Sequence, residues 1–158
     1  MKIIGGKLFK SNIKDLFSYT NEYLYISSYS MEVTSFEIFE FIQLIERNVK
    51  IEIITNKSIP IETLRKLEKL YGISIFQNEE VHSKIYVNEN RAILGSCNFG
   101  NLNIQRFYEC GILFKKYEFS KEHQFLINEF SNLKSLSKVL MPCLPSEIKK
   151  SLDLRDFI

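Results

Sequence analysis

The sequence has few cysteines and no long apolar segment, and both absences restrict the class of protein. Its three cysteines are odd in number, widely spaced and in no metal-ligand pattern, so we expect reduced thiols rather than disulfides or a zinc site. No apolar run approaches the ~18 residues that a membrane span requires. The N-terminal stretch MKIIGGKLFKSN also lacks the apolar segment of a signal peptide. We therefore expect a soluble, cytoplasmic protein without a membrane partner.

An excess of charge of one sign is also lacking. The 21 Lys and Arg residues against 19 Asp and Glu residues leave a net charge of +2. This balance allows an anionic partner but does not require one, because a nucleic-acid-binding domain is usually far more basic. Tryptophan is absent, yet thirteen phenylalanines and eight tyrosines in a chain of 158 residues are enough for one core. No internal repeat or low-complexity segment interrupts it.

Strand and helix patterns alternate in the first half of the chain. Residues 23–29 predict a buried strand, and Thr34 with Glu37 forms a capping box for a helix that ends near Asn48. Four apolar residues are expected on the inner face of this helix: Phe36, Phe39, Ile42 and Ile45. Three further elements are expected: a strand at 50–55, a helix from about Pro60 that Gly72 ends, and a strand at 73–76. Such alternation is typical of a parallel sheet.

Consecutive strands in the second half favour an antiparallel meander. A hairpin at 80–98 with the turn Glu89-Asn90 is followed by a strand at 107–114 and a helix that Ser120 caps. We predict an α/β sandwich, in which helices cover both faces of one mixed central sheet. Residues 1–136 would form this domain. The tail at 137–158 could pack on the domain, serve as a dimer arm or link to a further segment.

Several polar side chains meet at one end of the hairpin. Side chains alternate along a strand, so His82 and Lys84 share one face with Tyr86. The predicted turn lays residues 95–98 beside residues 82–84, which adds the donors of Ser96 and Asn98. An ammonium, a hydroxyl and a carboxamide suit an anion, and we expect the glycine at position 95 to leave room for the backbone to approach it.

A carboxylate completes this set. Glu109 lies in the apolar run FYECGILF, where an ionised side chain is costly unless it has a partner. The N–H of His82 would be such a partner, and the contact would determine which ring nitrogen is free to attack.

These residues are similar to the HKD signature of the phospholipase D superfamily. The similarity consists of His82-x-Lys84, a Gly-Ser-x-Asn run that ends at Asn98, and Glu109 eleven residues later. Small single-motif bacterial endonucleases and the nuclease domains of metal-independent restriction enzymes resemble it best. The order of elements matches that fold over about residues 1–133. The aspartate of the family motif is replaced by Glu89, which the predicted turn places away from the reacting groups.

The resemblance implies a chemistry that needs no metal and no cofactor. His82 would attack phosphorus and form a covalent phosphohistidine, which divides one displacement into two easier steps. Lys84, Asn98 and Ser96 would hold the non-bridging oxygens, and Glu109 would orient the imidazole. The leaving oxygen needs a proton from a second group, and single-motif relatives obtain it by pairing two chains. We therefore expect a homodimer with a shared active site.

Other polar or aromatic residues have less specific interpretations. We expect His123 on a partly solvated helix surface, Tyr86 in the core, and Lys115-Lys116 on the solvated surface unless they steer a phosphate backbone. Tyr29 could line the cleft or pack at its rim. Arg106, in the loop 101–106, is a candidate for a phosphate contact.

An endonuclease acting on DNA is the expected function, either nonspecific or the catalytic part of a restriction enzyme. Sequence recognition would need a separate domain or subunit, because the residues after Leu133 are too few for one. A phospholipid phosphodiesterase is an alternative, although no membrane-surface helix is evident. The second alternative is a non-catalytic nucleic-acid-binding module with the same fold.

Overall fold

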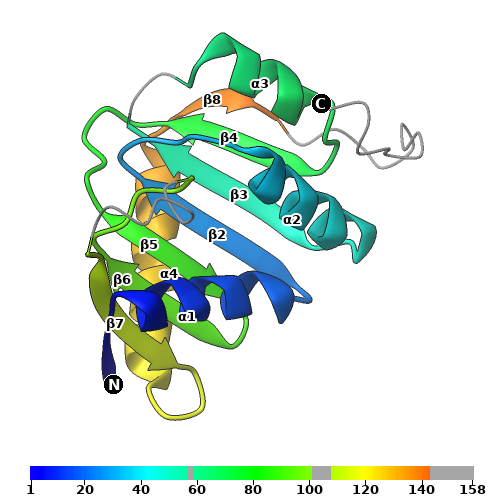
Figure 1. Ribbon diagram of the computed structural model, residues 1–158. Coiled ribbons are helices and arrows are strands. Elements are labelled where there is room, and N and C mark those ends of the chain that lie inside the picture. Colours follow the sequence, from blue (N-terminus) through cyan, green and yellow to red (C-terminus); the bar gives the residue numbers. More distant parts are fainter. Residues whose placement is uncertain (57–58, 101–107, 143–158) are drawn as a thin grey trace.

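Eight strands and four helices make up the part of the chain that the computed structural model describes, namely residues 1–56, 59–100 and 108–142 (Figure 1). The strands are β1 (Lys2–Gly5), β2 (Tyr23–Ser28), β3 (Lys50–Thr55), β4 (Ile73–Gln77), β5 (Lys84–Asn88), β6 (Arg91–Gly95), β7 (Cys110–Lys115) and β8 (Lys138–Met141). The helices are α1 (Lys7–Ser18), α2 (Ser35–Glu46), α3 (Ile61–Glu68) and α4 (Ser120–Ser135).

All eight strands belong to one sheet in the order β1-β7-β6-β5-β2-β3-β4-β8. β2, β3 and β4 are parallel, and the remaining pairs are antiparallel. The alternating first half therefore forms the parallel centre, and the meander of β5, β6 and β7 extends it from β2. This confirms the predicted mixed sheet.

Helices cover both faces of the sheet, as expected for the predicted sandwich. α1, α2 and α3 contribute to the larger apolar core, in which Phe9, Phe41 and Leu67 are fully buried. α4 lies behind the sheet in Figure 1 and packs Leu126 and Phe130 on the other face. Strand residues alternate between the two cores because of the period of two along a strand.

The inner face of α2 differs in part from the prediction. The capping box is present, since the Glu37 carboxylate accepts the Thr34 backbone N–H at 2.9 Å. Ile42 and Ile45 are buried as expected, but Phe39 is 46% exposed and Phe36 is half-buried. The prediction followed a spacing of three residues, which drifts around a helix. The buried apolar side chains follow the 3.6-residue period instead: Ile38, Phe41, Ile42, Leu44 and Ile45.

Other boundaries also differ from the sequence-based expectation. Ser120 is the first residue of α4 rather than its cap, and the Phe119 at the cap position makes no side-chain capping bond. β7 begins at Cys110, so Glu109 precedes the strand. β1 and α1 were not predicted. β8 pairs with β4, so the boundary expected after Leu136 cuts off a strand of the central sheet, and residues 143–158 lie outside the described part.

Candidate active site

The hairpin of β5 and β6 places the candidate residues at one end of the sheet. Lys84 is paired with Gly95 and Val87 with Ala92, which confirms the predicted turn at residues 89–90. The side chain of Asn88 closes this turn, because its Oδ1 accepts the backbone N–H groups of residues 90 and 91 at 2.9 and 2.7 Å. The register is therefore set at the turn, and it brings residues 95–98 beside the segment that begins at His82.

His82 and Lys84 are in direct contact. Lys84 Nζ donates to the backbone oxygen of His82 at 2.7 Å and lies 3.3 Å from its Nδ1. The Lys84 side chain is buried, and this burial lowers the pKa of its amine, whereas the negative charge of Glu109 acts in the opposite direction. The His82 side chain itself is exposed. The pair thus combines an accessible imidazole with a cation that is held against the backbone.

Glu109 contacts Ser96 rather than the imidazole of His82. The Ser96 hydroxyl donates to Glu109 Oε2 and accepts the backbone N–H of Cys110 at 3.1 Å. The backbone N–H of Ser96 also donates to the oxygen of Cys110 at 2.9 Å. These bonds join the end of β6 to the start of β7. They bring the Glu109 carboxylate close enough to influence Lys84 electrostatically. Within the described residues, however, Glu109 makes no hydrogen bond to His82, which it was expected to orient.

Asn98 is held by the end of β2. The hydroxyl of Ser28 lies 3.5 Å from Asn98 Oδ1 and accepts the backbone N–H of Phe99 at 2.8 Å. Phe99 also forms an isolated bridge with Met31. The segment after β6 is therefore attached to the segment after β2, and Asn98 is brought to the same end of the sheet as Lys84.

The packing around Gly95 explains its small size in a different way from the one we expected. A Cβ on Gly95 would lie 2.6 Å from Cε2 of Phe9, and a Cβ on Gly111 would lie 2.7 Å from the same atom. The absent side chains make room for the ring of Phe9 on α1, not for an anion. This packing holds α1 against β6 and β7 close to the candidate site.

Two residues lie at the far end of the hairpin. Glu89 is only 7% exposed, and its carboxylate accepts the backbone N–H of Asn21 at 2.8 Å and that of Glu22 at 3.4 Å. His123, expected on a partly solvated surface, is instead 1% exposed, and its Nε2 lies 2.8 Å from the oxygen of Asn88. Both residues act on the turn end of the hairpin, remote from His82.

Three candidates remain: Tyr86, Lys115 and Arg106. Tyr86 is fully buried as expected, and its hydroxyl donates to the backbone oxygen of Cys97 at 2.8 Å. Lys115 has its ammonium 3.0 Å from the Tyr117 hydroxyl on the surface. Arg106 lies outside the described residues.

Three neighbouring residues were not assigned to the site from the sequence: Ser27 and Ser28, which end β2, and Tyr29, which follows it. For Tyr29, the sequence left open whether it lines the cleft or packs at its rim. The signal that could have found them is their place at the carboxyl end of a central strand, where loops that follow the strands meet.

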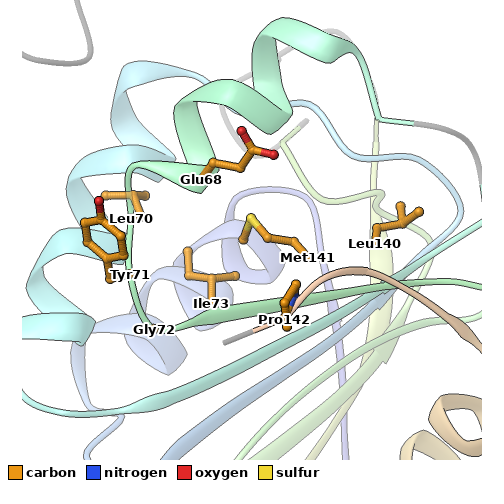
Figure 2. Close-up of a pocket in the computed structure, with 8 residues that line it drawn as sticks. All are labelled: Glu68, Leu70, Tyr71, Gly72, Ile73, Leu140, Met141 and Pro142. Atoms are coloured by element: carbon orange, nitrogen blue, oxygen red, sulfur yellow. The ribbon is translucent and has the colours of Figure 1, made fainter. Parts of the chain in front are cut away.

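An apolar cavity of about 260 Å³ lies elsewhere in the fold (Figure 2). Ile73 at the start of β4 and Met141 at the end of β8 contribute to its lining, whereas His82 follows the opposite end of β4.

In the three described ranges, no group of three or more His, Cys, Asp or Glu side chains is arranged to hold a metal ion. The helices in these ranges are each too short or too polar to cross a membrane.

One family model matches most of the chain. The model of the family described as "Cardiolipin synthase, PLD-like domain" matches residues 13–133 of the chain. No curated protein matches the sequence.

Solved structures share this fold at low sequence identity. NucT from Helicobacter pylori has a TM-score of 0.70 at 14% identity, with coverage of 88% of this chain and 98% of that chain. Nuc from Salmonella typhimurium, a phospholipase D family member, has a TM-score of 0.70 at 12% identity, with 89% and 99% covered. TrmBL2, an archaeal chromatin protein that binds DNA, has a TM-score of 0.63 at 10% identity, with 88% and 52% covered.

Proposed function

The chain belongs to the PLD-like domain family of the phospholipase D superfamily, and we propose that it is a metal-independent endonuclease that hydrolyses DNA phosphodiesters. The observation that carries the proposal is the convergence of an exposed imidazole, a buried ammonium, a hydroxyl and a carboxamide at one end of the sheet. The four residues are His82, Lys84, Ser96 and Asn98. No metal or cofactor takes part in the proposed reaction.

His82 is the nucleophile in this proposal. Its Nε2 attacks phosphorus and displaces the leaving oxygen, and water then cleaves the phosphohistidine. Lys84 and the amide of Asn98 donate to the non-bridging oxygens, where negative charge is concentrated in the transition state. Glu109 supports the arrangement through Ser96, whose hydroxyl it accepts, and its charge favours the ionised form of Lys84.

The contact between Lys84 and the imidazole has a consequence for the first step. An ammonium only donates, so at 3.3 Å it favours the tautomer of His82 in which Nδ1 accepts and Nε2 carries the proton. Attack through Nε2 requires the other tautomer. A phosphate oxygen that draws the ammonium of Lys84 away would release Nδ1 for protonation. Substrate binding would thereby activate the nucleophile.

A second copy of the chain supplies the proton for the leaving oxygen. The sequence has two histidines, and His123 is buried against Asn88 at the turn end of the hairpin. It therefore does not serve a phosphate at His82. A symmetric dimer that brings two exposed His82 side chains together provides a nucleophile and an acid from identical residues. A separate domain or subunit would direct the enzyme to particular DNA sequences.

The test is cleavage of supercoiled plasmid DNA in excess EDTA, with the mass in solution measured by sedimentation on the same sample. We expect cleavage by a dimer, and a loss of at least about a thousandfold in rate for His82→Ala. His123→Gln is the matched control, because it changes the other histidine and should leave cleavage intact. Dependence on added metal, cleavage by His82→Ala or an active monomer would each contradict the proposal.

Assays on the same protein preparation distinguish two alternative functions. A lipid phosphodiesterase is suggested by the description of the matching family, and faster turnover of phosphatidylcholine vesicles than of DNA would establish it. A non-catalytic DNA-binding module is suggested by the likeness to TrmBL2. Equal DNA affinity of the wild type and His82→Ala, with no cleavage of DNA or lipid, would favour that function.

A further inference from the structure

Three consecutive residues at the carboxyl end of β2 contact both halves of the candidate motif. The residues are Ser27, Ser28 and Tyr29, and β2 lies between β5 and β3 in the centre of the sheet (Figure 1). We infer that this segment, which contains none of the motif residues, is a positioning element that aligns His82 with Asn98. The inference rests on the proposed phosphodiesterase function, and it assigns a role in that site to residues outside the motif.

Tyr29 holds the imidazole and the ammonium together. Its ring centroid lies 5.1 Å from that of His82, with an angle of 50° between the ring planes. Lys84 Nζ lies 5.6 Å from the same centroid, within the range of a cation–π contact. One ring therefore limits the orientation of the exposed imidazole and attracts the adjacent cation. Because the His82 side chain is exposed, a neighbouring ring restricts side-chain torsions that solvent alone would leave free.

Ser28 positions the second half of the motif. Its side chain is fully buried, and its one hydroxyl proton lies between two acceptors, the backbone oxygen of Ser30 at 2.7 Å and Asn98 Oδ1 at 3.5 Å. The hydroxyl oxygen accepts the backbone N–H of Phe99 at 2.8 Å. Asn98 Oδ1 lies on the side of this hydroxyl, and its Nδ2 has no hydrogen bond to another described residue. The donor that a phosphate oxygen needs is thus kept available, because the amide oxygen faces the protein.

Ser27 attaches the residue between His82 and Lys84. Its hydroxyl lies 3.2 Å from the backbone oxygen of Ser83 and 3.0 Å from the Ser83 hydroxyl. Because Ser27 points to the face opposite Ser28, the two serines hold the two motif segments from both sides of the sheet. The contacts of Ser27, Ser28 and Tyr29 explain how residues 82–84, at the start of β5, keep a defined position relative to residue 98.

The first experiment measures the imidazole directly. The chain has only two histidines, so their ring signals in NMR spectra are readily assigned, and the buried His123 is an internal reference. In Tyr29→Leu we expect the His82 signals to move, because the ring current of Tyr29 is lost, while the His123 signals stay in place. Tyr23→Leu, at the other end of β2, is the matched control. Unchanged His82 signals in Tyr29→Leu would overturn the inference.

Kinetics then separate positioning from simple packing. We expect Tyr29→Leu to lower kcat about 10- to 100-fold with KM changed less than about 3-fold, because misplacement of a reacting group by ~1 Å has effects of this size. Tyr29→Phe should keep kcat within about 3-fold of the wild type, since the ring is retained. A loss in Tyr29→Phe as large as that in Tyr29→Leu would overturn the role of the ring.

A double-mutant cycle tests Ser28. Ser28→Ala should lower kcat/KM by about tenfold in the wild type but less than about twofold in Asn98→Ala, if Ser28 acts through Asn98. Equal factors in both backgrounds would contradict positioning. Ser28→Cys keeps the size and provides the cycle if Ser28→Ala does not fold. If the wild type cleaves no DNA or lipid, the proposed function fails by itself, whereas the NMR comparison of Tyr29→Leu still decides the positioning of His82.

Discussion

Glu89, which stands where the resemblance to the HKD signature leads us to expect an aspartate, provides the sharpest test of the division between structural and reacting residues. The residue is 7% exposed, and its carboxylate accepts two backbone N–H groups of the connection between α1 and β2, at 2.8 Å from Asn21 and 3.4 Å from Glu22. It lies five residues beyond Lys84, or about 16 Å along an extended chain. Glu89→Ala should therefore reduce stability without changing the chemistry at His82.

The contacts indicate the size of this effect. A hydrogen bond to a charged group contributes about 1.5–3 kcal/mol, and the longer bond to Glu22 is at the weak end of this range. Removal of the carboxylate also leaves two N–H groups with no side-chain partner. We expect Glu89→Ala to lower the free energy of unfolding by about 2–4 kcal/mol, which corresponds to a fall in Tm of roughly 5–12 °C for a domain of this size.

Urea denaturation followed by circular dichroism measures this loss, and plasmid cleavage at 20 °C measures activity on the folded fraction. Glu89→Asp restores the family residue with a side chain one methylene shorter, so its loss should be smaller than that of Glu89→Ala. Glu22→Ala is the matched control, because it removes an exposed carboxylate and keeps the backbone donor. Its effect should stay within about 0.5 kcal/mol.

Two results would refute this reasoning. Wild-type stability of Glu89→Ala would show that the backbone N–H groups find water without cost, and the carboxylate would then have no structural role. A large loss of kcat in a variant that remains fully folded would show that the motif acid acts on the reaction despite its distance from His82.

Two further predictions concern packing and pH. Burial lowers the pKa of His123 below its ordinary 6.5, as does the charge of Lys116, against the opposing bond to the oxygen of Asn88. The unfolded chain then binds more protons than the folded chain as pH falls through 6.5, so the free energy of unfolding should decrease on acidification. Urea denaturation at pH 7.5 and at pH 5.5 measures this decrease, which should be smaller in His123→Gln than in the wild type. Gly111→Ala places a Cβ 2.6 Å from the backbone oxygen of Leu94 and 2.7 Å from the ring of Phe9. Calorimetry should show a loss of about 1–3 kcal/mol, and an unchanged Tm would mean that the strands separate freely.

The local elements were predictable wherever one pattern dominates. The capping box of Thr34, the β-rich run of β3 and the turn at Glu89 were predicted correctly, because capping, alternation and turn chemistry depend on neighbours in the sequence. α1 was missed, since seven of its twelve residues are polar or charged, and the ring of Phe9 packs over two glycines that lie far away in the sequence. β8 was missed because a four-residue strand is stabilised by its pairing with β4.

The sequence by itself determined which residue types stand at the offsets of the candidate site and so predicted its members: His82, Lys84, Ser96, Asn98 and Glu109. Only the tertiary structure decided their contacts. It paired Glu109 with Ser96, buried His123, and brought Ser28 and Tyr29 against a motif more than fifty residues away. Such contacts depend on the order of strands in the sheet, and no spacing along the chain encodes that order.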